Sequence, residues 1–488
     1  MKRLRWYDFI SINIFWLGLN LRNSAVGAIF MPYLVDAFAP EAIRNTALGE
    51  MRTAGLVIAM LAQPLMGLLS DRNTSRFGRR RPFIFTGVML DLLFLAGIAV
   101  AANYWQLLVA VLLIQFSSNI SHGPLQALIP DLVPEDQRGR ASAVKSIFEL
   151  LPLVILGATI APLVGAGHFT WAVAAAAGGL LLTMLLTVLL VKETPITVKP
   201  DVPLGPTMLR VLGMLAGIAV GAVAGLLAGA LVGALAGLAV WPFLGQQSAL
   251  NLMVALGGVV AMIVAVVAGV WAGVLSTLGS QARRQPSFTW WVTNRLMFLA
   301  AITSIQSFAP FFLMYAFQVD RQQAASMTGT LVMVVGIFTL TSALPSGWIS
   351  DKLGQKRLIG ISGLLAALGT GIVLLTIWTP NLSLIYLAGG ILGLATGLFV
   401  TTNWALGTRL VPDEQAGRYL GVSNLAGAGA GIVGAGIGGP VADYLNNSLP
   451  GLGYFVIFSG YLVLFLISVV ILRWINERPV ALSPVEGG

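Results

Sequence analysis

The sequence predicts an all-α polytopic membrane protein, and three observations carry that prediction. Of 488 residues, 57% are hydrophobic and 10% are charged, whereas soluble domains carry about 25% charged residues. The apolar residues form long runs, each sufficient for the roughly 20 residues that one membrane span needs. The basic residues collect in the short segments between these runs, so the net charge of +9 reports membrane topology and not a nucleic-acid partner.

Fourteen apolar segments are expected to cross the bilayer as helices. The first is interpreted as a retained span, because its apolar run shows no small-residue cleavage site. The expected spans cover residues 9–34, 49–69, 82–102, 106–130, 142–164, 170–191, 209–240, 249–277, 288–318, 324–349, 358–378, 383–408, 419–441 and 452–473.

The distribution of Lys and Arg predicts which side of the membrane each loop occupies. With both termini in the cytoplasm, only Arg44, Arg52 and Arg321 of the 28 basic residues fall on the outer side, and Arg22 and Arg295 fall within spans. Cytoplasmic loops are the ones enriched in Lys and Arg. The sequence therefore predicts a multi-pass protein of the cell (inner) membrane with cytoplasmic N- and C-termini.

Two loop sequences occur twice along the chain. DLVPEDQRGRASAVKS, beginning at Asp131, corresponds to RLVPDEQAGRYLGVSN, beginning at Arg409, and GLLSDR at Gly67 corresponds to GWISDK at Gly347. Repetition at nearly one spacing indicates a duplicated half. Both copies fall on the predicted cytoplasmic side, so the two six-helix halves run parallel, as in one transporter architecture.

The spacing between the repeats exceeds the length of six spans, and the excess matches two Gly/Ala-rich spans. Glycine recurs at every fourth position from Gly213 to Gly237, and small residues recur likewise from Gly257 to Gly273. Such stripes let helices approach closely in lipid, which predicts a hairpin of two packed helices. The expected organisation is an N-terminal bundle (1–192), a cytoplasmic linker (193–208), the inserted hairpin (209–280), a C-terminal bundle (281–475) and a cytoplasmic tail (476–488).

The first repeated loop carries a family resemblance. GLLSDRNTSRFGRRRPFI, from Gly67 to Ile84, resembles the loop after the second span of the major facilitator superfamily, and GWISDKLGQKR resembles its counterpart in the second half. The segments TSRFGRRRPFI and GPLQALIPDL are similar to the sucrose/H+ symporters of the glycoside-pentoside-hexuronide cation symporter group. The resemblance implies a major facilitator fold that moves a solute by alternating access.

Two departures keep other functions open. The plant-type symporters usually have Arg where Gln126 stands, and the twelve-span symporters lack the inserted hairpin. Fourteen spans and the segment GATIAPLVGAG resemble a drug/H+ antiporter branch, although Ala161 replaces the Gly usual before the Pro and the fourth-span Arg of that branch is absent.

The repeated loops are expected to act as gates. A carboxylate at a span's end can accept hydrogen bonds from a helix amino terminus and from clustered Arg, and breaking such a network would release one half from the other. The simpler alternative is that the Arg run only fixes topology. The predicted gating residues are Gly67, Asp71, Arg72, Gly78, Arg79, Arg80, Arg81, Asp131, Arg140, Gly347, Asp351, Lys352 and Arg418.

Polar side chains inside the spans are the candidate substrate contacts, because polar groups at membrane depth are costly and usually functional. The resemblance implies that the first, fourth, seventh and tenth spans, counted without the hairpin, line a central cavity. Amides, hydroxyls and an aromatic ring suit a neutral polyhydroxylated ligand, although each amide could instead bond a neighbouring helix. The predicted cavity residues are Asn20, Gln115, Asn119, His122, Gln126, Gln306, Asn403 and Trp404.

Four ionisable residues lie well inside spans: Arg22, Asp91, Glu149 and Arg295. Glu149 lies about 10 Å into its span at about 1.5 Å per residue, and it is the first choice of partner for Arg22, with Asp91 the second. A carboxylate paired with Arg and exposed to alternating water could bind and release a proton. The alternative is a permanent ion pair that braces two helices.

The function predicted from the sequence is a secondary active transporter, specifically a proton-coupled sugar or glycoside symporter. The alternatives are a drug/H+ efflux antiporter and a non-transporting membrane assembly factor. With no Cys, two His and none of the enzyme motifs sought, the sequence predicts no enzyme, metal or cofactor. The expected partners are a small-molecule substrate, H+ and the lipid bilayer, and no nucleic acid.

Overall fold

The computed structural model describes residues 3–193, 204–279, 286–411 and 416–476, with the side chains of 204, 207 and 416–428 outside the description. Its elements are helices. Most of the expected linker (193–208), nearly all of the tail (476–488) and the Arg418 side chain therefore lie outside the described residues. We call residues 3–193 the N-terminal half and residues 286–476 the C-terminal half.

The N-terminal half follows the expected spans, with two interruptions that the sequence does not predict. Short π-helices, η1 and η4, interrupt the first and fifth spans. The elements of this half are α1 (Trp6–Ser24), η1 (Ala25–Phe30), α2 (Met31–Phe38), η2 (Glu41–Ile43), α3 (Arg44–Asp71), α4 (Arg81–Ala99), α5 (Tyr104–Leu132), η3 (Glu135–Gln137), α6 (Arg138–Ile155), η4 (Leu156–Ile160), α7 (Ala161–Gly165) and α8 (Phe169–Leu190).

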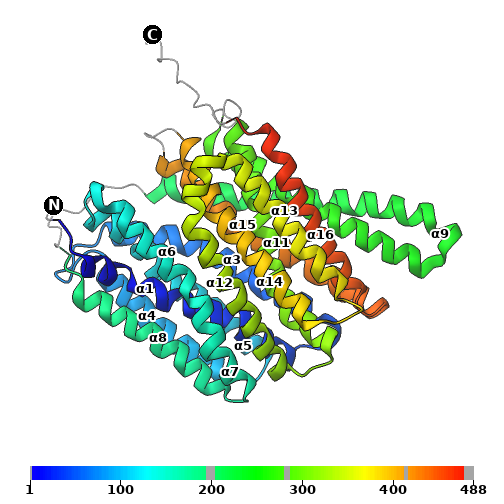
Figure 1. Cartoon of the computed structure of the whole chain (residues 1–488), viewed down its shortest axis with the longest axis horizontal. Helices are drawn as coiled ribbons and strands as arrows, with labels where there is room; N and C mark the ends of the chain where they lie inside the picture. Colours follow the sequence, from blue (N-terminus) through cyan, green and yellow to red (C-terminus); the bar gives the residue numbers. More distant parts are fainter. Residues whose placement is uncertain (1–2, 194–203, 280–285, 412–415, 477–488) are drawn as a thin grey trace, which may run out of the picture.

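The C-terminal half repeats this pattern of long apolar helices. Figure 1 shows the two halves side by side. Its elements are α11 (Pro286–Phe317), α12 (Arg321–Leu353), α13 (Gln355–Leu375), α14 (Leu382–Arg409), α15 (Ala416–Ser448), α16 (Leu452–Ile471) and η6 (Leu472–Trp474).

Three helices start with side-chain caps at the same end of the bundle. The side-chain oxygens of Asn103, Asp320 and Asn381 accept hydrogen bonds from backbone N–H groups at 3.0, 2.8 and 3.2 Å, at the start of α5, α12 and α14. Caps of this kind satisfy donors that the first turn leaves unpaired. We call this the far end, and the end with the arginine-rich loop 72–80 the basic end.

Helix α9 (Leu204–Leu278) is the inserted element, and it turns back on itself at Gly245, where φ is 76°. A Cβ added at Gly225 would lie 2.5 Å from the carbonyl oxygen of Ala261 and 2.8 Å from Cβ of Ala265. The two arms therefore pack backbone against backbone through the glycine stripe. Figure 1 shows them as a hairpin at the edge of the bundle.

The second arm of α9 attaches the hairpin to the C-terminal half. Gly258 lies against Val441 of α15, and Met262 lies against Gly460 of α16. The first arm presents exposed leucines such as Leu227 and Leu231. An apolar surface of this kind suits a lipid environment.

In the described part of the chain, twelve helices are long and apolar enough to cross a membrane. One of them covers Met208–Leu278 and includes both arms of the hairpin. The chain is thus a multi-pass membrane protein, and the count of fourteen spans stays a prediction.

Substituting Gly225→Leu should destabilise the hairpin by about 1–3 kcal/mol, because the added side chain meets backbone that cannot move aside. The measurement is the unfolding midpoint of the purified protein in detergent. Ala230→Leu, which adds similar bulk at an exposed position on the same arm, is the control. Equal midpoints for the two variants would show that the glycine contact does not stabilise the hairpin.

Candidate functional site

A cavity of about 390 Å³ lies between the two halves. Helices α1, α3 and α5 with η1 form its N-terminal side, and α11 and α15 form its C-terminal side. We call it the central cavity. Its polar lining residues are Arg22, Asn23, Arg52, Gln63, Gln115, Ser118, Asn119, His122, Thr303, Ser304 and Ser307.

The polar stripe predicted on the fourth span reaches this cavity. Gln115, Asn119 and His122 of α5 line it, since residues four and seven positions apart share one helical face. The Asn119 amide donates to the backbone oxygen of Gln115 at 2.7 Å. Gln126 is exposed beyond the cavity and lies 3.3 Å from the His122 ring through its amide nitrogen.

Asn20 is not among the residues lining the cavity, because its amide turns back along α1 and donates to the oxygen of Trp16 at 2.9 Å. The Trp16 ring meets the His122 ring edge to face at 5.3 Å. The Lys145 ammonium also contacts this ring, 4.3 Å from the Trp16 ring centre. Asn20 therefore contacts the backbone of Trp16, whose ring touches His122 of the cavity lining.

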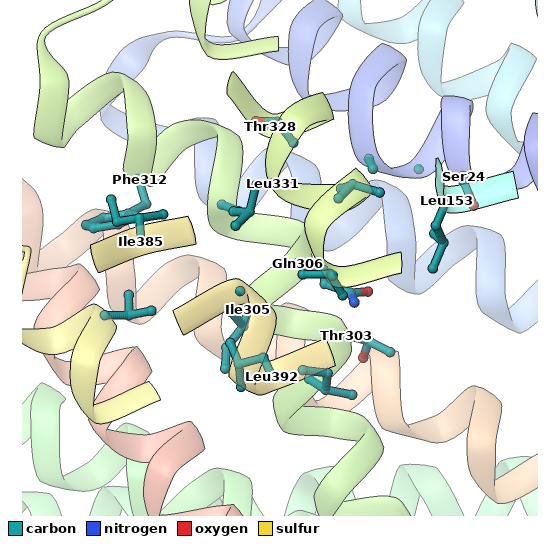
Figure 2. Close-up of a pocket in the computed structure, with 18 of the residues that line it drawn as sticks. Ser24, Leu153, Thr303, Ile305, Gln306, Phe312, Thr328, Leu331, Ile385 and Leu392 are labelled. Atoms are coloured by element: carbon teal, nitrogen blue, oxygen red, sulfur yellow. The ribbon is translucent and has the colours of Figure 1, made fainter. Parts of the chain in front are cut away.

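A second, mostly apolar pocket of about 220 Å³ adjoins the central cavity. We call it the side pocket. Figure 2 shows the Gln306 amide and the Thr303 hydroxyl on the side that faces Ser24 and Leu153, with Phe312 and Ile385 farther away. Gly27, Arg52 and Thr303 line both spaces, so they form the shared wall.

The predicted residues of the tenth span lie elsewhere. Asn403 is fully buried, and its amide donates to the Asn294 side chain at 2.9 Å while its backbone oxygen accepts from the Trp291 indole at 2.9 Å. Neither Asn403 nor Trp404 lines either cavity. The amide of Asn403 is used to tie α14 to α11, which explains why it does not face the cavity.

Arg295 belongs to the same group of contacts. It donates to the Asn403 side chain at 3.3 Å and stacks over the Trp404 ring at 5.3 Å. No carboxylate among the described residues forms an ion pair with Arg295. A guanidinium over an aromatic ring gains cation–π attraction, which partly compensates a missing counter-charge.

The expected pairing of Arg22 with Glu149 is wrong. Arg22 forms an ion pair with Asp91, and the side chains are 1% and 0% exposed. Ser118 accepts from Arg22 at 2.6 Å and Ser117 donates to Asp91 at 2.6 Å. Arg22 on α1 and Asp91 on α4 both face the serines of α5, which closes a buried network beside the cavity.

Glu149 pairs instead with Lys145, one turn away on α6, at 3.2 Å. About a third of its side chain is exposed. The local i,i+4 pair and partial access to solvent remove the need for a distant partner, since a partly exposed carboxylate keeps part of its hydration.

Arg52 is a functional candidate that sequence reasoning placed on the outer side of the membrane. It lies eight residues into α3, where it lines both cavities and donates to the backbone oxygen of Gly27. The early start of α3 at Arg44 moves Arg52 inward from the end of the helix. The signal in the sequence is an Arg within a long apolar segment, but its position near the start of that segment favours the outer side of the membrane.

The gating residues of the N-terminal half form a compact network at the basic end. Arg80 pairs with Asp71 and with Asp131, the latter at 2.9 Å, and its backbone N–H donates to the Glu193 carboxylate at 2.8 Å. Arg79 also pairs with Asp131.

Neighbouring residues complete this network. Arg80 further contacts the Ser70 hydroxyl and the Gly67 oxygen. Gly78 has φ of 105°, a left-handed conformation that favours glycine. Each of these contacts lies within the N-terminal half. The expectation that the network itself fastens one half to the other therefore does not hold in this conformation.

The other predicted gating residues lie in both halves. Arg72 lies at the end of α3, Arg81 begins α4 and Arg140 is exposed on α6. In the C-terminal half, Gly347 and Asp351 are exposed, and the Lys352 ammonium lies 3.7 Å from the Trp348 ring centre. Within the described ranges Asp351 forms no ion pair.

Among the described residues, the side-chain hydrogen bonds that join the halves lie at the far end. Asp443 of α15 accepts hydrogen bonds from the backbone N–H and side-chain groups of Asn45 and Thr46, at 2.7 to 3.2 Å. We call these three residues the far-end latch. A carboxylate at the first turn of α3 satisfies unpaired N–H groups and the positive end of the helix dipole.

Comparisons with known proteins match this architecture. A family model described as Major Facilitator Superfamily matches residues 17–288, 220–435 and 296–487. The nucleoside transporter NupG superposes with a TM-score of 0.65 at 12% identity, covering 95% of this chain and 99% of NupG, which shows the fold.

Curated relatives match over shorter segments. Sucrose transport protein SUT1 of Oryza sativa subsp. japonica is 32% identical over 116 residues, which is 19% of this chain and 22% of the relative. Minor myo-inositol transporter IolF of Bacillus subtilis (strain 168) is 30% identical over 135 residues, 28% of this chain and 29% of the relative. The chain therefore matches less than a third of the length of these relatives. On the family match, which spans most of the sequence, the chain belongs to the Major Facilitator Superfamily.

Proposed function

We propose that this protein is a secondary active transporter that carries a sugar or glycoside by alternating access, coupled to a proton. The observation that carries the proposal is the central cavity, which lies between the two halves and is lined in part by amides, hydroxyls, an imidazole and two arginines. Such groups donate and accept hydrogen bonds in the way that sugar hydroxyls require. Matches to named sucrose and inositol transporters support this substrate class.

The arrangement of contacts supports an alternating-access cycle. Side-chain hydrogen bonds join the halves at the far-end latch, while the gating network of the basic end stays within one half. With the basic end in the cytoplasm, as the Lys and Arg distribution favours, this is a conformation closed to the outside. The opposite conformation requires the far-end latch to open.

Proton coupling is proposed to use Asp91 rather than Glu149. Asp91 is buried against Arg22, which is one of the residues that line the cavity. A ligand or water that draws Arg22 away would leave Asp91 desolvated and favour its protonation. Glu149 already has Lys145 and solvent, so its protonation has no direct link to the cavity.

An efflux antiporter for amphipathic compounds remains a second candidate because of the side pocket. Its lining includes Ile302, Ile305, Leu331, Val335 and Phe312, which suit an apolar group. The same pocket could hold the apolar part of a glycoside.

The test is uptake of radiolabelled sucrose and myo-inositol by proteoliposomes under an imposed proton gradient. We expect accumulation that a protonophore abolishes and that Asn119→Ala, in the cavity, reduces at least tenfold. Asn251→Ala, on the hairpin, is the control and should leave uptake unchanged. Proton-driven expulsion of ethidium with no uptake of either sugar probe would favour the antiporter and overturn the proposal.

A further inference from the structure

Arg52 occupies the wall shared by the central cavity and the side pocket, together with Gly27 and Thr303. One terminal nitrogen of its guanidinium donates to the backbone oxygen of Gly27. The Nε atom is buried and has no hydrogen-bond partner. A guanidinium has five N–H donors, so most of its capacity is not used by the protein contacts described.

The partner of Arg52 is a carbonyl that the helix cannot satisfy. In η1 the Met31 N–H bonds to the Val26 oxygen, five residues back. The next such bond would join Gly27 to Pro32, and proline has no N–H to donate. The π-helix therefore leaves the Gly27 oxygen free to orient Arg52 between the two cavities.

The charges around the cavity are unequal. The charge of Arg22 is balanced by Asp91. Arg52 has no carboxylate within ion-pair distance among the described residues. The other polar lining groups of both spaces are amides, hydroxyls and His122. A cation held among spans without a counter-charge is costly, and a bound anion would remove that cost.

We infer that Arg52 binds an anionic group of the ligand, so that the substrate is a hydroxylated carboxylate. The carboxylate group of the ligand would accept hydrogen bonds from the free N–H donors of Arg52. The hydroxyls of the same ligand would face Asn119, Gln115 and Thr303 in the central cavity. Charge-assisted pairs of Arg with carboxylate are strong and directional. This inference rests on the proposed transport function, and it narrows the substrate from a neutral sugar to an acidic one.

The test compares D-gluconate with D-glucitol, which share a six-carbon hydroxylated chain and differ in the carboxylate. Binding to the purified full-length protein is measured by the ligand-induced shift of the unfolding midpoint over a concentration series. We expect gluconate to bind at least tenfold more tightly than glucitol. Arg52→Gln should weaken gluconate binding by about tenfold to a hundredfold, the loss of a charged hydrogen-bond pair, and should leave glucitol binding unchanged.

Two further variants separate recognition from folding. Arg52→Lys keeps the charge and loses the planar fork, so gluconate binding should be intermediate. Arg357→Gln removes one positive charge from an exposed position at the basic end and should bind both probes like the wild type.

Equal binding of the two probes by the wild type, or gluconate binding unchanged in Arg52→Gln, would overturn the inference. Neutral sugar uptake in proteoliposomes would then still support the proposed function. If no solute is taken up but gluconate binding depends on Arg52, the proposed transport function fails and the inference about Arg52 stands.

Discussion

Replacing Asp91 with alanine is expected to lower the free energy of unfolding by about 3–5 kcal/mol, because Arg22 would stay buried without its counter-charge. The two side chains are almost fully buried, and the hydroxyls of Ser117 and Ser118 form hydrogen bonds with this pair. The measurement is the unfolding midpoint in detergent, with denaturant dependence where unfolding is reversible.

Two further variants test whether the loss of stability comes from the unpaired charge of Arg22. Arg22→Met combined with Asp91→Leu removes both charges and should recover most of the lost stability, since apolar replacements of a buried pair are often neutral. Glu149→Ala, which breaks a partly exposed local pair, should cost less than about 1 kcal/mol. Comparable losses in Asp91→Ala and Glu149→Ala would contradict the assignment of Asp91 as the partner of Arg22.

The same pair offers a separate test of coupling. Asp91→Asn fixes a neutral side chain of the same size, which can still accept a hydrogen bond from Arg22 although the counter-charge is lost. The variant that remains folded should still exchange solute while losing accumulation against a gradient. Glu149→Gln should accumulate solute like the wild type. The reverse outcome would return the coupling role to Glu149.

Much of the fold follows from patterns that survive in a single sequence. Apolar runs predict the helices because each span must satisfy its own backbone in lipid, and the repeats at Gly67 and Gly347 predict two related halves. The four-residue glycine period identifies the packed arms of α9, since only close backbone contact requires it at positions such as Gly225. The stripe of Gln115, Asn119 and His122 is recognisable because helical periodicity alone places it on one face.

The partner of a buried charge could not be predicted in this way. Periodicity says which residues of one helix share a face, and it does not say which face meets another helix. Arg22 meets Asp91 because of the rotation of α1 relative to α4 and α5. That rotation is set by the packing of all three helices. The π-helices also change the helical register locally, and the residues before Pro32 and Pro162 do not predict this change. Asp443 carries no sequence signal as a latch, because its partners are distant residues of the other half.

Opening of the far end is expected to depend on Asp443, whose carboxylate accepts four hydrogen bonds from Asn45 and Thr46. Its side chain is 5% exposed, so removing it leaves these donors in a poorly hydrated interface. Because hydrogen bonds to charged groups contribute about 1.5–3 kcal/mol, Asp443→Ala should raise the population open at the far end by tenfold or more.

The chain lacks cysteine, so a single Met51→Cys, at a buried position lining the central cavity, reports that opening through labelling by an impermeant thiol reagent. In Asp443→Ala the labelling rate should rise at least tenfold, and in Asp443→Asn, which keeps one acceptor oxygen, it should rise less. Asp320→Ala is the matched control, because Asp320 caps α12 at the same end within one half, and its labelling rate should equal that of the parent. A rate in Asp443→Ala equal to that of Asp320→Ala would mean that the packing of α3 on α15, through contacts such as Gly439 against Asn45, closes the far end without the carboxylate.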